Sequence, residues 1–446
     1  MCLTPDTPKP ASSLLTLSEV APMGDSLHHV ASQLRFSADG RSLCVDWDAA
    51  MQTGPDNGRR FLQTDFITRS ARDVFLTDDM LRDLLALAPR VASDECLLAF
   101  FWYCRHRVLT DATLIDSWEA PWPALDDYLG AEAGLLNVLV MLSAVPEMLD
   151  VYRRLGVPAD LYRDTISDLR RWIETDYYQH RYQRFGITPW IARWLCHHWR
   201  GVILQLGRLQ FSLGAFTGRL SAFRHRQTRR VIALSEAGIR YTSEGSMWRE
   251  CCGHDAGAWT STFERTTGSV TGNPITPDGR AHRALCSLQL ADWEPVLSRD
   301  EDVLVFHVPV GAPLTFDMCG DSFHRALEAF PRYYPDFHFR AFFTSTWMMD
   351  PRLQQLVAPE SNIVRLQREM YVYPGLQGDN SQYYERIFGW GTTDINQVEW
   401  KTSLQRAVGI YLSNGGHFHG GYCFLLKDDF DWGTQTYLSM ASAELP

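Results

Sequence analysis

Long apolar runs and a regular cysteine pattern are both missing from this sequence. The longest largely apolar stretches, such as VLVMLSAV at 138–145, fall well short of the roughly 20 residues that span a bilayer, so we expect no membrane partner. The ten cysteines include no C-x-x-C pair, which argues against a zinc ribbon and against a disulfide framework. We therefore predict no metal site, and thiols that are mostly buried.

The N-terminus has no apolar core of the kind found in signal peptides. MCLTPDTPKPASSLL carries three prolines and an early acidic residue, which is typical of a flexible tail. We assign this tail to residues 1–13 and expect a cytoplasmic protein.

Positive charge is also scarce, since the formal net charge is -11. Binding to a phosphate backbone depends on Lys and Arg that displace counterions, so we expect no nucleic-acid partner. The local exception is RLSAFRHRQTRR at 219–230, which we interpret as a solvated basic face.

The 446 residues, 45% of them hydrophobic, are enough for two or three domains, and the first part has helical patterns. TDDMLRDLLALAP at 77–89 predicts a helix capped by Thr77 and stopped by Pro89. A second helix follows GVPAD at 156–160, and 188–211 has the pattern of one long aromatic helix. We predict a helical domain over 14–230.

After residue 230 short extended runs alternate with turn residues and later with helices. The stretches GIRYTSEG and GSVTGNPITPDGR predict antiparallel hairpins. The segments that follow predict strands over 302–310, 338–349, 361–373 and 421–426, and helices over 321–334, 351–358 and 403–415. We expect an α+β domain over 231–446.

Antiparallel strands followed by strand, helix, strand, helix and strand is the element order of the GNAT fold of acyl-CoA-dependent N-acyltransferases. VLVFHVPVGAPL, FTSTWMMDPRLQQL, SNIVRLQREM and LGRLQF together resemble a bacterial two-domain acyltransferase family. The resemblance implies a helical N-acyltransferase N-terminal domain packed on a GNAT-like mixed β-sheet flanked by helices. It also implies an acyl transfer.

In that fold, the turn after the strand ending near His307 leads into a helix whose N-terminus receives the pyrophosphate of coenzyme A. Free N–H groups and the helix dipole favour an anion there. The resemblance therefore makes Val310, Gly311, Ala312 and Ser322 the candidate donor-binding residues. We expect acyl-CoA as a co-substrate and no permanently bound cofactor.

The donor loop departs from the usual GNAT pattern of Gln or Arg, two residues, Gly, one residue, then Gly or Ala. Val308 stands where the basic or amide residue belongs, and Pro313 stands at the last position. A proline offers no N–H to a phosphate. An acyl carrier protein is therefore an alternative donor.

Direct transfer from a thioester to an amine needs a base, donors for the oxyanion and an acid for the leaving thiolate. His307 is the candidate base, and Asp350 is the second catalytic candidate, with helix capping as its structural alternative. Trp347, Tyr371 and Tyr373 are candidate pocket residues. We predict an N-acyltransferase acting on a small-molecule or peptide amine; the alternative is a non-catalytic GNAT-like binding module.

Two further clusters suggest other chemistry. ECCGHD at 250–255 holds the residue types of a thiol hydrolase, although nucleophile and base usually meet through the fold. GGHFHGG at 415–421 places His417 and His419 two positions apart, where they could bind a metal if a third ligand converged. A mobile loop over the substrate is the alternative.

Replacing Cys251 and Cys252 by Ser tests the thiol hydrolase. If both thiols are structural, the double variant should keep its acyl-transfer rate within a few fold of wild type. Complete loss of turnover in a folded double variant would revive the thiol mechanism.

Overall fold

The computed structural model describes residues 25–441, except 38–39, 41, 43, 116–118, 176, 250–254 and 377–379. The predicted tail over 1–13 and the cysteine pair Cys251 and Cys252 lie outside the described residues. Contacts divide the chain into two compact units, and the division falls between Gln205 and Leu206, inside strand β1 (Ile203–Leu206).

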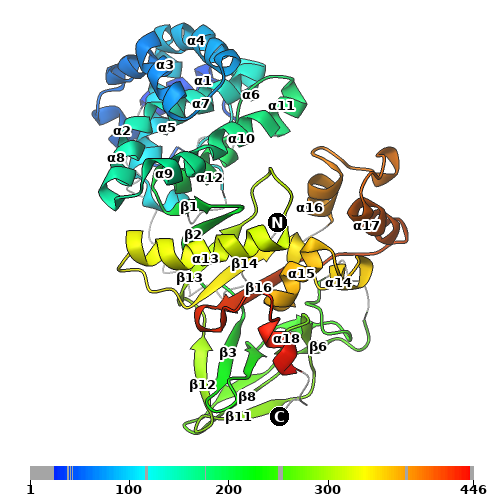
Figure 1. Ribbon diagram of the computed structural model, residues 1–446. Coiled ribbons are helices and arrows are strands. Elements are labelled where there is room, and N and C mark those ends of the chain that lie inside the picture. Colours follow the sequence, from blue (N-terminus) through cyan, green and yellow to red (C-terminus); the bar gives the residue numbers. More distant parts are fainter. Residues whose placement is uncertain are drawn as a thin grey trace, which may run out of the picture. The chain divides into compact units, whose positions relative to one another are not determined.

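The first unit is helical (Figure 1). Its α-helices are α1 (Asp25–Gln33), α2 (Trp47–Gln52), α3 (Thr64–Asp73), α4 (Asp78–Ser93), α5 (Glu95–Thr110), α6 (Asp126–Leu129), α7 (Ala133–Ser143), α8 (Val145–Leu155), α9 (Ala159–Ile166), α10 (Asp168–Thr175), α11 (Tyr177–Tyr182) and α12 (Pro189–Trp199). Every residue of α7 is buried, so this apolar helix is the centre of the unit's core.

No single helix in the described ranges is long and apolar enough to cross a membrane. One pair, Asp126–Ser143 and Val145–Leu155, meets that criterion only when it is taken together across a 44° bend. The first member of the pair includes α7, which is buried inside its unit.

Two helix boundaries differ from the sequence predictions. Helix α4 continues past Pro89 to Ser93, because its buried face continues to Val91. Helix α12 ends at Trp199 instead of running to 211. Gly201 follows it with φ 62°, and the N–H groups of Gly201 and Val202 bond back to the carbonyls of His198 and His197, which is a Schellman termination.

The larger sheet has six strands in the order β1, β2, β13, β14, β16, β15. The remaining bounds are β2 (Leu209–Ala215), β13 (Asp302–His307), β14 (Ala341–Thr346), β15 (Tyr371–Pro374) and β16 (Gly421–Leu426). Strands β13 and β14 are parallel and are joined by helix α13 (Phe316–Tyr333), which lies across the sheet in Figure 1. The predicted strand, helix and strand in this stretch are confirmed, and the chain is α+β.

The remaining strands form smaller antiparallel sheets. Their orders are β10-β9-β4-β3-β12, β11-β8-β7 and β5-β6. The bounds are β3 (Leu220–His225), β4 (Val231–Ser235), β5 (Arg240–Tyr241), β6 (Trp259–Thr260), β7 (Phe263–Arg265), β8 (Ser269–Gly272), β9 (Pro274–Thr276), β10 (Arg280–Ala281), β11 (Cys286–Gln289) and β12 (Trp293–Leu297). The predicted hairpin is confirmed for β9 and β10, with Gly279 at φ 88° in their turn. Strands β8 and β9 instead lie in different sheets, and β5 pairs with β6.

Residues 361–373 were predicted as one strand, and this prediction is wrong for most of the segment. Helix α15 (Asn362–Glu369) occupies the first part, and only Tyr371–Pro374 forms a strand. The hydroxyl of Ser361 caps the helix by accepting a hydrogen bond from the N–H of Val364. The apparent alternation of apolar residues was too short to separate a strand from a helix.

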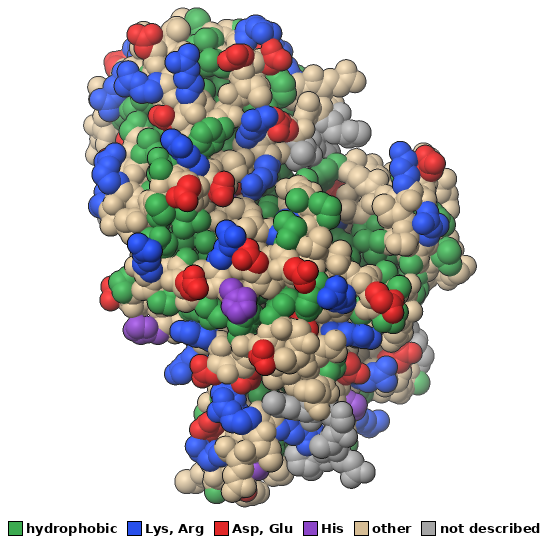
Figure 2. Space-filling view, in the orientation of Figure 1, with side chains coloured by type: hydrophobic (Ala, Val, Ile, Leu, Met, Phe, Trp, Pro, Cys, Tyr) green, Lys and Arg blue, Asp and Glu red, His purple; other side chains and the backbone are tan. Residues whose placement is uncertain are grey.

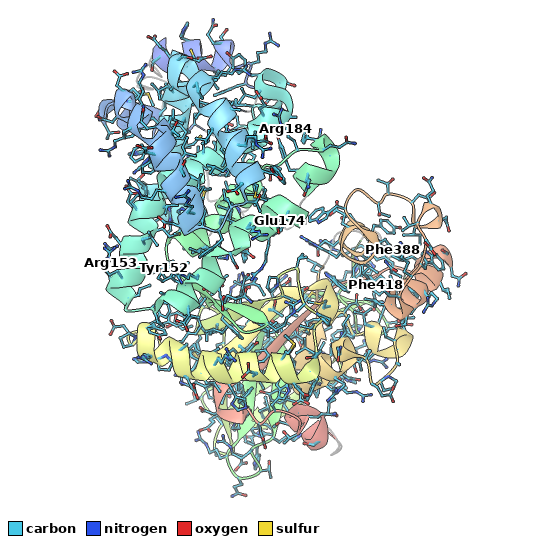
Figure 3. All side chains as sticks on the ribbon, turned by 45° about the horizontal axis from the view of Figure 1, so that its top comes forward. Tyr152, Arg153, Glu174, Arg184, Phe388 and Phe418 are labelled. Carbon is cyan, nitrogen blue, oxygen red and sulfur yellow. The ribbon has the colours of Figure 1, made fainter. Side chains whose placement is uncertain are left out.

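A helical lobe, residues 380–420, lies between β15 and β16. It contains α16 (Ser381–Tyr383), a π-helical turn (Tyr384–Phe388), a 3₁₀ turn (Ile395–Gln397) and α17 (Ser403–Ser413). Its apolar cluster includes Phe388 and Phe418, labelled in Figure 3, and the ring of Phe418 stacks on Tyr383 with centroids 4.0 Å apart. A short helix α14 (Leu353–Leu356) adds Leu353 to this cluster, and α18 (Thr436–Ala441) ends the described chain.

The basic segment 219–230 runs through β3. Arg219 pairs with Glu236, Arg226 pairs with Glu294, and the buried Arg224 pairs with Asp429. On the face drawn in Figure 2, cationic and anionic side chains are interspersed. The segment therefore consists largely of paired charges and not of an open cationic surface.

Phe323 on α13 should be a key stabilising residue of the larger sheet. Its fully buried ring contacts Phe211, Phe306 and Phe342, one from each of three adjacent strands. We expect Phe323→Ala to lower the opening free energy of β13 and β14 by about 3–5 kcal/mol, measured by hydrogen exchange of their amides.

Met318→Ala on the same helix is the matched control, because Met318 is 39% exposed. It should change exchange by less than about 0.5 kcal/mol. Equal effects of the two substitutions would contradict the stabilising role of Phe323 in the larger sheet.

Candidate active site

The parallel ladder between β13 and β14 stops before either strand ends. Its last pair is Val305 with Phe343, whereas β13 continues to pair with β2 as far as His307. Strand β14 continues to pair with β16 as far as Thr346. Among these described residues the two strands therefore part at their carboxyl ends, which is the edge where ligands bind in sheets of this kind.

His307 lies at this opening, on the sheet face opposite α13. Its neighbour Phe306 packs on Phe323 of α13, so His307 points to the other face. The Nε2 atom of His307 is 3.1 Å from the Oγ of Ser212, which also lies 3.5 Å from the carbonyl oxygen of Val305. A hydroxyl that donates to the carbonyl accepts from Nε2–H, which makes Nδ1 the basic nitrogen of His307.

Strand β14 contributes to the same face. Phe343 and Ser345 alternate with the α13-facing Phe342, and Ser345 is paired with Tyr422 of β16. The two hydroxyls are hydrogen-bonded, and burial raises the pKa of Tyr422. A partly buried phenol thus lies on the face that also carries His307.

The predicted donor residues divide into an exposed and a buried group. Val310, Gly311 and Ala312 lie in the exposed loop 308–315, where Gly311 has φ 148° and no atom within 4 Å of an added Cβ. Thr315 caps α13 by accepting from the N–H of Met318. Ser322 lies one helical turn after Met318 and is fully buried, and its hydroxyl accepts from the N–H of Arg208 and donates to the carbonyl of Met318.

Asp350 is fully buried beyond the end of β14. One carboxylate oxygen accepts from the N–H of Arg352, and the other accepts from the N–H groups of His419 and Gly420 and from the hydroxyl of Tyr383. Burial raises the pKa of this carboxyl, and these hydrogen bonds oppose the shift. The geometry makes Asp350 an anchor for the segment that precedes β16, and α14 begins three residues after it.

The three predicted pocket residues lie in different surroundings. Trp347 is half-buried and meets Tyr383 of the helical lobe edge-on, with ring centroids 5.8 Å apart. Tyr371 is buried, and its hydroxyl donates to the carbonyl of Ile275 while it accepts from the N–H of Ala233. Tyr373 is buried and stacks on Tyr422.

The structure therefore brings His307, the loop 308–312 and the neighbourhood of Tyr373 to one end of the sheet. It places Asp350, Tyr371 and Ser322 in buried hydrogen-bond networks. Ser212 and Tyr422 were missed by the sequence analysis. Ser212 could not be found because 188–211 was read as a helix, which obscured the alternation of the strand that contains it.

The two histidines of GGHFHGG lie close together, with ring centroids 5.4 Å apart. Within the described ranges no group of three His, Cys, Asp or Glu side chains could hold a metal ion. The Nδ1 of His419 is 3.1 Å from the carbonyl oxygen of Met247, and burial, with the charge of Arg352, lowers the pKa of His419 to about 3.

His419 should make stability depend on pH. Above pH 6.5 the imidazole is neutral in both the folded and the unfolded chain. As the pH falls from about 6.5 towards about 3, the unfolded chain takes up a proton that the folded chain refuses, so stability is lost over this window. Between pH 7 and pH 5 this contribution is about 2 kcal/mol.

We therefore expect His419→Asn, whose amide nitrogen replaces Nδ1, to reduce the loss of unfolding free energy between pH 7 and pH 5. Urea unfolding at the two pH values measures it. The exposed His338 is the control, and His338→Asn should leave the wild-type pH dependence unchanged. An unchanged dependence in His419→Asn would show that His419 does not resist protonation.

Comparison with known proteins follows the same division of the chain. Residues 65–201 match the N-acyltransferase N-terminal domain family, and residues 203–425 match the GNAT-like C-terminal domain family. No curated protein matches the chain.

Several solved structures share the fold. An acyltransferase in complex with decanoyl-CoA and teicoplanin is 19% identical, with a TM-score of 0.62 over 90% of this chain and 99% of that chain. An acyltransferase mutant in complex with octanoyl-CoA gives the same values. An acyltransferase in complex with CoA and 10C-teicoplanin is 18% identical with a TM-score of 0.61, at the same coverage of both chains. The chain belongs to the family of two-domain acyltransferases in which an N-acyltransferase N-terminal domain precedes a GNAT-like C-terminal domain.

Proposed function

We propose that this protein is an N-acyltransferase that moves an acyl group from acyl-CoA to an amine of a small molecule or peptide by direct transfer. The observation that carries the proposal is the parting of β13 and β14 with His307 at the opening and the loop 308–315 directly after it. The related acyltransferase structures hold acyl-CoA or CoA, and two of them also hold a glycopeptide of the teicoplanin type, which supports this reaction class.

In the proposed reaction the amine nitrogen attacks the thioester carbonyl. Nδ1 of His307 takes the proton that the nitrogen loses, while Ser212 holds Nε2 and thereby orients the ring. The carbon–sulfur bond then breaks and the thiolate leaves. Tyr422 is the candidate acid for that thiolate, because its phenol lies on the sheet face that also carries His307. Burial raises the pKa of Tyr422, so the phenol holds its proton at neutral pH.

The donor's diphosphate is assigned to the loop 308–315 and the start of α13. The capped helix start presents backbone N–H groups, and Gly311 leaves space for a close approach of an anion. An acyl carrier protein presents the same phosphopantetheine arm and remains the alternative donor. Bacterial origin and cytoplasmic location stay predictions.

A non-catalytic binding module is the second candidate. The observation that favours it is the loop sequence, which has Val308 at the usual basic position and prolines at 309 and 313. Such a module would bind acyl-CoA without releasing free CoA.

Two substitutions separate catalysis from donor binding. We expect His307→Ala to lower kcat by about 10²-fold or more, as for loss of a general base, with donor KM within a few fold of wild type. Gly311→Val should raise donor KM and leave kcat nearly unchanged, since it adds a side chain at φ 148°. The assay uses octanoyl- and decanoyl-CoA with a panel of amine acceptors, and mass spectrometry detects the acylated product.

Gly238→Val is the control for backbone strain, because Gly238 also has positive φ and open space around it but lies in the turn after β4. It should not change donor KM. Full activity of folded His307→Ala would remove His307 from the mechanism. Donor binding by wild type without any product would support the binding module.

A further inference from the structure

The loop 308–315 and the first two turns of α13 contain no Lys or Arg of their own. The fold brings a cation to this loop from the turn between β1 and β2. Arg208 is 9% exposed, and its guanidinium donates from Nε to the carbonyl of Ala312 at 2.7 Å and from Nη1 to the carbonyl of Pro309 at 2.8 Å. A buried, permanently charged side chain thus holds the loop at two points.

The backbone of the same residue is attached to α13. The N–H groups of Arg208 and Leu209 donate to the hydroxyl of Ser322 at 2.9 and 3.3 Å. Gly207, at φ 68°, forms the tight turn, and Ser322 lies 3.1 Å from the position of an added Cβ there. The guanidinium is therefore fixed relative to both the loop and the helix start.

These contacts determine the direction in which one backbone N–H group of the loop points. The described residues contain no cis peptide bond, and in a planar trans peptide the C=O and the following N–H point in opposite directions. Because the carbonyl of Pro309 points towards Arg208, the N–H of Val310 points away from it. The carbonyl of Ala312 is held in the same way, but Pro313 follows it and offers no N–H.

We propose that Arg208 is the positioning residue of the donor loop. It holds the loop so that the Val310 N–H faces the diphosphate of acyl-CoA, and its positive charge takes the place of the basic loop residue that is missing at Val308. This inference rests on the proposed function, because that function assigns the donor to this loop.

The test compares three donors that carry the same acyl group. Acyl-CoA has the diphosphate, S-acyl-4′-phosphopantetheine has one phosphate, and S-acyl-pantetheine has none. In Arg208→Gln, KM for acyl-CoA should rise about tenfold or more, the size expected from losing hydrogen bonds to a charged group, while kcat changes less than about threefold. KM for S-acyl-pantetheine should stay at the wild-type value.

The KM for S-acyl-4′-phosphopantetheine shows whether the loop recognises a single phosphate or the full diphosphate. A rise in its KM equal to that of acyl-CoA would assign the effect to the phosphate shared with a carrier protein. A smaller rise would assign it to the full diphosphate. Both results support Arg208, because both differ from S-acyl-pantetheine.

Arg208→Lys should show an intermediate KM for acyl-CoA. Lysine keeps the charge but lacks the planar fork that reaches both carbonyls. Arg208→Lys also serves as the test variant if Arg208→Gln does not fold. Arg325→Gln is the control, since Arg325 is an exposed α13 arginine that pairs with Asp321 and should leave all three KM values unchanged.

A purely structural role predicts that KM rises equally for all three donors, and this result would overturn the proposal, as would unchanged KM values. Calorimetric titration with CoA separates the two proposals. CoA binding that weakens in Arg208→Gln, without any acyl transfer by wild type, would refute the enzyme function alone. Acyl transfer by wild type with donor KM independent of Arg208 would refute this inference alone.

Discussion

The early end of the ladder between β13 and β14 is the constraint on which the site depends. Each strand stays bonded to its outer antiparallel partner after the two have parted, so neither can close the opening without losing that pairing. Below the opening, the ring of Phe323 contacts Phe306 and Phe342 and holds the strands together. The opening is therefore local and confined to the carboxyl ends of the two strands.

Two buried charged side chains fix the segments on either side of this opening. Arg208 binds carbonyl groups of the loop after β13, and Asp350 binds N–H groups of the segment before β16. A buried charge is costly unless it is hydrogen-bonded, so each side chain favours the one loop conformation that satisfies it. Each of the two segments is thus held at its backbone by one buried charged side chain.

The sequence predicted elements well where a pattern was long or strongly punctuated. Helix α13, strand β14 and helix α17 followed directly from periodicity and turn residues. The prediction failed where a short apolar run fits both the two-residue period of a strand and the 3.6-residue period of a helix. Residues 203–206 and 209–215 are strands that follow a Schellman termination at Gly201, and residues 362–369 are a helix whose signal was the capping serine Ser361. In β1 burial of every residue removes the alternation, and over 364–372 four apolar residues at even spacing imitate a strand although α15 occupies most of that segment.

By itself the sequence determined the fold class, the order of elements around 302–349 and the presence of an unusual loop with two prolines after His307. The tertiary structure alone decided what that loop contacts. Ser212 reaches His307 through the register of β2 with β13, and Arg208 reaches Pro309 and Ala312 from the preceding turn. These partners lie about a hundred positions away in sequence, where strand pairing and not local propensity selects the contact.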